Sequence, residues 1–105
     1  MTEEPVNLGA NIQLTGFREL DPGSMTVLRK MIGNHARRFS EICRKFEMLK
    51  LQMKPIHESD RSEKYEVHGF LQDNGKHFSS HASDINLFFA VDRVLKKLEH
   101  EIGEK

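Results

Sequence analysis

The sequence contains too few cysteines and too short apolar runs for a disulfide-stabilised or membrane-spanning protein. Cys43 is the single cysteine among 105 residues, which excludes an intrachain disulfide and fits a reducing compartment. No stretch approaches the roughly 18 to 20 apolar residues that cross a bilayer. The opening residues, Met-Thr-Glu-Glu-Pro, are acidic and lack the apolar centre of a secretory signal. We therefore expect a cytoplasmic protein without a membrane partner.

Motifs that support enzymatic chemistry are also missing. The chain has no phosphate-binding loop, nucleophile elbow or Cys-x-x-Cys spacing, and its carboxylates are dispersed. His77 and His81 fall on one face of a predicted strand, but residues four apart on a strand are separated by about 13 Å, too far to ligate one ion directly. We expect no catalysis, no cofactor, no metal site and no small-molecule substrate.

Length and composition fit one globular domain. With 37% apolar and 30% charged residues, the chain is not disordered in composition, and 105 residues suffice for one core. We expect a flexible N-terminal tail over residues 1–10 and a single domain over residues 11–103.

The formal net charge of zero conceals an uneven distribution. Residues 29–54 contain eight Lys or Arg and two acids, a local net charge of +6, whereas every other segment is net acidic. Local potential, rather than total charge, attracts an anionic partner within a Debye length of about 8 Å. A nucleic-acid partner is therefore compatible with this composition.

Periodicity predicts four strands and two helices. The predicted strands cover residues 12–16, 46–53, 65–72 and 76–82, and the predicted helices cover residues 25–43 and 86–102. Asp21 or Ser24 is expected to cap the first helix, and Ser83 or Asp84 the second. Pro55 is expected to end the second strand or to lie at its edge.

Two connections separate the later strands. Residues 58–62 are polar and aperiodic, which predicts a loop, and residues 73–75 form an Asp-Asn-Gly sequence typical of a tight hairpin. The order β-α-β-β-β-α predicts an α+β fold in two layers, with a four-stranded sheet and two helices on one of its faces. The uncovered sheet face, predicted to be plain solvent surface or a second contact with protein or RNA, would carry Lys50, Gln52, His68, Phe70, His77 and His81.

The last predicted helix combines a complete apolar stripe with a basic opposite side. If the two helices lie side by side, one solvent-exposed face would combine their cationic side chains with an exposed phenylalanine. The candidate RNA-binding residues on this face are Lys30, Arg37, Arg38, Phe89, Arg93, Lys96, Lys97 and His100, with Asn34 beside them. Lys and Arg neutralise phosphates, and an exposed Phe offers a stacking surface for an unpaired base. The alternative is an ordinary solvated helix face.

Several segments carry a family resemblance. Ile12-Gln-Leu-Thr-Gly16, the Asn74-Gly75 hairpin and residues 86–99 (Asn-Leu-Phe-Phe-Ala-Val-Asp-Arg-Val-Leu-Lys-Lys-Leu-Glu) resemble the ribosome hibernation-promoting factor family, also called ribosome-associated inhibitor A. That family shows a strand ending Ile-x-Thr-Gly and a last helix close to Asp-Met-Tyr-x-Ala-Ile-Asp-x-x-x-x-Lys-Leu-Glu. This chain has Asn86 in place of the leading Asp, and His100 where an Arg often follows.

The resemblance implies a fold and a function. The implied fold is similar to double-stranded RNA-binding domains, and the implied partner is the small ribosomal subunit with its rRNA, bound near the decoding centre through the basic helices. The implied activity is repression of translation in stressed or resting cells, by a protein expected to be monomeric off the ribosome. Two alternatives stay open: a generic double-stranded RNA-binding module, and a protein interaction domain that uses the open sheet face.

Overall fold

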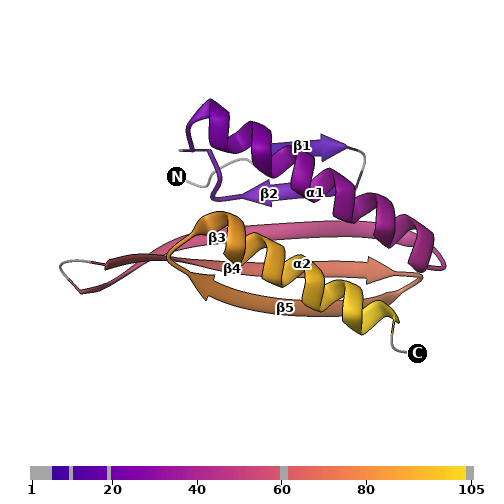
Figure 1. The fold of residues 1–105 in the computed structure, drawn as a ribbon. Helices are drawn as coiled ribbons and strands as arrows, with labels where there is room; N and C mark the ends of the chain where they lie inside the picture. The colour runs from indigo at the N-terminus through magenta and orange to yellow at the C-terminus, as the bar shows by residue number, and fades with distance from the viewer. Residues whose placement is uncertain (1–5, 10, 19, 60–61, 104–105) are drawn as a thin grey trace.

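A computed structural model describes residues 6–9, 11–18, 20–59 and 62–103. In chain order its elements are β1 (Val6–Gly9), β2 (Ile12–Thr15), α1 (Pro22–Ile42), β3 (Phe46–Ser59), β4 (Ser62–Asp73), β5 (Lys76–Asp84) and α2 (Leu87–Gly103). The strands form one sheet in the order β1-β2-β3-β4-β5, and both helices lie on the same face of it (Figure 1). β2 and β3 are parallel and the other pairs are antiparallel, so α1 is the crossover between parallel strands.

The predicted α+β fold is confirmed, with one addition at the N-terminus. The four-stranded mixed sheet β2 to β5 and the two helices follow the predicted order β-α-β-β-β-α. Residues 6–9, which the sequence placed in a flexible tail, instead form β1 and pair antiparallel with β2. This pairing satisfies backbone groups that would otherwise be unpaired at the β2 edge. Residues 1–5 and 10 of the predicted tail lie outside the described residues.

α1 begins where its capping residue predicts. The Asp21 carboxylate accepts hydrogen bonds from the Ser24 backbone N–H at 3.0 Å and from the Ser24 hydroxyl at 2.7 Å. These bonds hold the pKa of Asp21 below its usual value, because they stabilise the ionised carboxylate. Pro22 follows at the first helical position. A backbone N–H at this position has no acceptor within the helix, so proline loses no hydrogen bond there. Asp21, rather than Ser24, is therefore the cap.

The β3–β4 hairpin is longer than the sequence predicts. β3 continues past Pro55 to Ser59, and β4 begins at Ser62, so the predicted loop over residues 58–62 is wrong for all of its described residues. The parallel pairing of β2 with β3 ends at Gln52. Beyond that residue β3 has a free edge among the described strands, where a proline without an N–H is tolerated.

The turn between β4 and β5 confirms the predicted tight hairpin. Asn74 and Gly75 have φ values of 50° and 84°, as a type I′ turn requires. The buried Asp73 carboxylate accepts the Lys45 N–H at 2.9 Å, which fixes the hairpin to the connection between α1 and β3.

One core lies between the sheet and the two helices. Its members are apolar residues at alternating strand positions and on one side of each helix, and the fully buried ones include Leu14, Leu28, Ile32, Phe39, Leu49, Leu51, Val67, Val91, Val94, Leu95 and Leu98. A Cβ at Gly69 would overlap Val94, because α2 lies directly against β4 at this point. The close contact between α2 and β4 therefore requires glycine at position 69.

α2 is confirmed as a helix, but its predicted cap is wrong. The Asn86 side-chain oxygen accepts the Phe89 N–H at 3.2 Å, so Asn86 caps the helix. Ser83 and Asp84 still belong to β5, where Asp84 pairs with Tyr65. The Asp84 carboxylate instead accepts the Asn86 N–H at 2.9 Å. Within the described residues, neither helix is long and apolar enough to span a membrane.

Candidate nucleic-acid interface

All eight residues predicted to bind RNA are solvent-exposed. The structure distributes them over several regions rather than one continuous surface. Five of them lie on the side of α2 that faces away from the core, because residues such as Val91, Leu95 and Leu98 occupy the buried side. These five are Phe89, Arg93, Lys96, Lys97 and His100.

The first region is a groove between α1 and α2. Its lining residues are Met31, Asn34, His35, Arg38, Asp92 and Lys96. Arg38 and Lys96 contribute positive charge from the two helices, as predicted. Each also faces an acid on α2: the Arg38 Nη1 lies 3.7 Å from Glu99 Oε1, and the Lys96 Nζ lies 2.9 Å from Asp92 Oδ2.

His35 lies at the floor of this α1–α2 groove. It is 7% exposed, with Nε2 at 3.4 Å from Asp92 Oδ1 and Nδ1 at 3.9 Å from Glu99 Oε1. Burial raises the pKa of Asp92, but hydrogen bonds from Lys96 and His35 outweigh it, and the pKa lies below the usual 3.8. Asp92 is therefore anionic at neutral pH and partly neutralises the groove.

The second region is a groove between α2 and the edge strand β5. Ser79, Ser80, His81, Lys96, Lys97, His100 and Glu101 line it. The Lys97 Nζ donates a hydrogen bond to the His81 carbonyl oxygen at 2.9 Å, which spans the groove from helix to strand. Lys96 lines both grooves and therefore connects them. Two lysines, two histidines and one acid line this groove, so with neutral histidines its formal net charge is +1, the same as that of the α1–α2 groove.

The first turns of α2 carry Phe89 and Arg93. The Phe89 side chain is 61% exposed, which confirms the predicted exposed aromatic surface. Arg93 is held at the end of β5, with Nη2 at 3.2 Å from Asp84 Oδ2. Its Nη1 also donates to the Ser83 carbonyl oxygen at 3.5 Å. Arg93 is thus paired within the protein before any partner binds.

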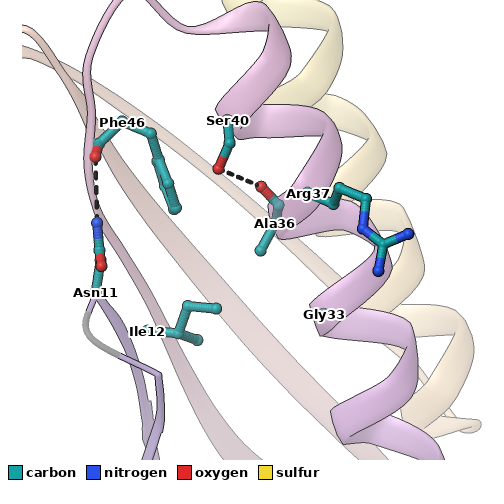
Figure 2. Close-up of a pocket in the computed structure, with 7 residues that line it drawn as sticks. All are labelled: Asn11, Ile12, Gly33, Ala36, Arg37, Ser40 and Phe46. Carbon is teal, nitrogen blue, oxygen red and sulfur yellow. Dashed lines mark hydrogen bonds between the residues drawn. The ribbon is translucent and has the colours of Figure 1, made fainter.

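Arg37 lies apart from Arg38 although the two are adjacent in sequence. Arg37 lines a groove of about 440 Å³ on the side of α1 that faces β2, together with Asn11, Ile12, Gly33, Ala36, Ser40 and Phe46 (Figure 2). Successive helical residues are rotated by about 100°, which separates Arg37 from the groove that contains Arg38. Lys30 is exposed on α1 and lines neither of the α2 grooves.

The prediction did not identify the acids that pair with these cations. The Asp92–Lys96 pair has i, i+4 spacing on α2, so the sequence already contained a signal for it. Glu99 and Asp84 reach Arg38 and Arg93 only through tertiary packing, for which the sequence contains no local signal. Among the residues that the structure describes, no group of three or more His, Cys, Asp or Glu is placed to hold a metal ion.

Comparisons with known proteins establish the fold. No protein-family model matches the sequence, and no curated protein matches it. A solved ribosomal subunit interface protein from Coxiella burnetii aligns with a TM-score of 0.64 and 17% identity, covering 90% of this chain and 96% of that chain. The Protein Y N-terminal domain from Thermus thermophilus aligns with a TM-score of 0.47 and 18% identity, covering 73% and 80%. The resemblance predicted from the sequence is thus confirmed at the level of the fold, which this chain shares with a protein described as a ribosomal subunit interface protein.

Proposed function

We propose that this chain is a ribosome-binding translation inhibitor that occupies the mRNA and tRNA path of the small subunit. The binding surface in this proposal is the outward side of α2 with the two grooves beside it. Arg38, Lys96, Lys97 and His100 would contact rRNA phosphates, and Phe89 would stack on an unpaired base. Lys30, Arg37 and Arg93 would make contacts at the periphery of this surface.

The observation that carries the proposal is the position of Lys96, Lys97 and His100. They lie on one side of α2, and their groove also includes the exposed edge of β5. Long cationic side chains beside a strand edge can reach two phosphates of a folded RNA at once. The similar fold of a ribosomal subunit interface protein, over almost the whole of both chains, adds support for a ribosomal partner.

The intramolecular ion pairs do not prevent this binding. Arg38 and Lys96 are more than half exposed in their pairs, at 63% and 68%. Exposed pairs of this kind contribute only about 0 to 1 kcal/mol. Phosphate groups that release counterions on contact with Lys and Arg can therefore replace Glu99 and Asp92 as partners.

The proposed inhibition is steric and needs no chemical step. In this proposal the protein is monomeric off the ribosome, acts in the cytoplasm of stressed or resting cells, and uses no cofactor. Occupation of the decoding region by a folded domain would exclude mRNA and tRNA while it stays bound.

Competition on purified small subunits tests this proposal. Subunits preincubated with the protein should load less mRNA and tRNA in a filter-binding assay, and excess mRNA and tRNA should displace the protein in turn. The matched control is an RNA duplex, which should bind more weakly than the subunits. Equal affinity for any duplex would favour a generic double-stranded RNA-binding module, and simultaneous binding with mRNA and tRNA would contradict path occupation.

A further inference from the structure

The sheet face opposite the helices carries a second set of side chains, of which only Ser79 and His81, on the edge strand, also line the α2–β5 groove. Pairing of β3, β4 and β5 places them in three cross-strand rows, which are Met48–Gln72–His77, Lys50–Phe70–Ser79 and Gln52–His68–His81. α1 and α2 both cover the other face, so neither of these helices covers this open sheet face (Figure 1).

Aromatic and imidazole rings lie at the centre of the open sheet face. Phe70 is 36% exposed, an unusual position for a large apolar side chain. On the neighbouring row, the rings of His68 and His81 stack with centroids 5.6 Å apart and an interplanar angle of 22°. Phe70 and His68 are two residues apart on β4, and are therefore about 7 Å apart along the strand. Flat rings at this spacing can accept two successive bases.

The open sheet face has few charges, with two lysines against one acid, and this small positive excess favours an anionic ligand. Lys50 forms no ion pair with the described residues. Lys54, on the same face of β3, is exposed and lies opposite Glu66 in the β3–β4 register. The acids near them already have partners. Glu66 Oε1 lies 2.8 Å from His68 Nε2, and Glu47 Oε1 accepts the Gly75 N–H at 2.6 Å.

We propose that the open sheet face binds a single-stranded RNA segment. Bases would stack on Phe70 and on the His68–His81 pair, while Lys50 and Lys54 would contact phosphates. Sheets that bind single-stranded RNA combine aromatic platforms with basic residues in this way. The choice of RNA as the nucleic acid rests on the proposed function, whereas the stacking surface rests on this sheet alone.

The composition of the open sheet face favours single-stranded RNA over a protein partner and over an RNA duplex. A protein partner would be expected to meet a larger apolar centre, but Phe70 and Met48 are the apolar members of the three rows. A duplex cannot offer its bases to a ring on a flat sheet, because paired bases are stacked on one another. Unpaired bases can stack on the rings and form hydrogen bonds with the polar side chains of the three rows.

Fluorescence anisotropy with a labelled single-stranded RNA of about ten nucleotides tests the inference, since such surfaces cover about 4 to 16 nucleotides. Phe70→Ala should weaken binding by about tenfold or more, from the loss of one base–aromatic stack. Phe70→Tyr is the matched control at the same position. It retains the ring and should stay within about twofold of the wild-type affinity.

His68→Ala provides a second test, because this half-exposed β4 side chain belongs to the stacked pair but lines neither of the α2 grooves. It should also weaken RNA binding, and RNA should shift backbone amide resonances of β3 to β5 in NMR spectra. Wild-type affinity in both Ala variants, or shifts confined to α2, would overturn the inference. Self-association that depends on Phe70, without RNA binding, would overturn it in favour of a protein interface.

The open-face inference and the proposed function can be rejected independently of each other. Small-subunit binding that is retained in Phe70→Ala, together with no affinity for single-stranded RNA, would reject the open-face inference alone. Binding of the oligonucleotide without any competition on small subunits would reject the proposed function alone.

Discussion

Single side chains show how this chain balances charge across the contact between its helices. His35 is buried between Asp92 and Glu99, and its Nδ1 atom and Glu99 Oε1 are buried without a hydrogen bond to described residues. Arg38 and Lys96 complete the cluster at its exposed rim. The cluster therefore orients two of the proposed RNA-binding residues through their acidic partners.

Replacement of His35 by Ala should destabilise the fold. The variant loses the contact with Asp92 and leaves a cavity beside Phe39, so we expect the free energy of unfolding to fall by about 1 to 3 kcal/mol. Urea unfolding followed by circular dichroism measures this change. His77→Ala, at an exposed position, should change the value by less than about 0.5 kcal/mol. Equal effects of the two substitutions would show that His35 has no structural role.

Asp92 should make stability depend on acid pH. Because its pKa is lower in the folded protein than the usual 3.8, its charge stabilises the fold above that pH. This contribution is lost as the pH falls through the folded-state pKa. Wild type should therefore be more stable than Asp92→Asn at pH 6, with the difference shrinking below about pH 4. A difference that is constant from pH 6 to about pH 2.5 would contradict the ionic role.

Helices and strands were predictable wherever one periodicity dominated. The buried stripe of α2 and the Asn74-Gly75 turn have local signals, and both agree with the structure. β3 beyond Pro55 was not predictable, because a proline is excluded from a central strand but not from an edge, and the edge depends on where β2 ends. The candidate site was also predictable only in part. Periodicity identified the exposed cations, whereas tertiary packing decides which groove or acid each one meets.

The contact between α2 and β4 depends on Gly69. A Cβ there would overlap Val94 and approach Leu98 and Leu51, so Gly69→Ala should lower the free energy of unfolding by about 1 to 3 kcal/mol. Gly33→Ala is the matched control, because an added Cβ within α1 meets nothing within 4 Å. It should raise stability by about 0.5 to 1 kcal/mol. Thermal unfolding of both variants checks the pair, and a neutral Gly69→Ala would show that the helix is not held this closely.

The start of α2 depends on Asn86 rather than on the residues before it. Asn86→Ala removes the acceptor for the Phe89 N–H and should cost about 0.5 to 2 kcal/mol of stability. Ser83→Ala, at a position the sequence also suggested as a cap, should be nearly neutral. Denaturant midpoints of the two variants distinguish the caps, and a larger loss in Ser83→Ala would contradict this assignment.

The protein as a unit has no net charge but presents two chemically different faces. The helix side has paired cations in grooves on both sides of α2, and the sheet side has exposed rings with few charges. Formal neutrality therefore gives little information about its partners, because the potential at each face is set by local groups. Binding through the helix side should depend strongly on salt. When phosphates bind, they replace the acidic partners of the cations, and counterions are released from the RNA.

The most direct measurement is co-sedimentation with purified small ribosomal subunits at about 0.1 M and about 0.4 M salt, for two variants of equal charge. One variant carries Lys96→Gln and Lys97→Gln. The control carries Lys45→Gln and Lys76→Gln, at exposed positions near the β4–β5 turn. Wild type and control should bind at the lower salt and dissociate at the higher. The Lys96/Lys97 variant should bind more weakly, with a salt slope reduced by about two. Equal loss in both variants, or binding that does not depend on salt, would contradict rRNA recognition by the α2 grooves.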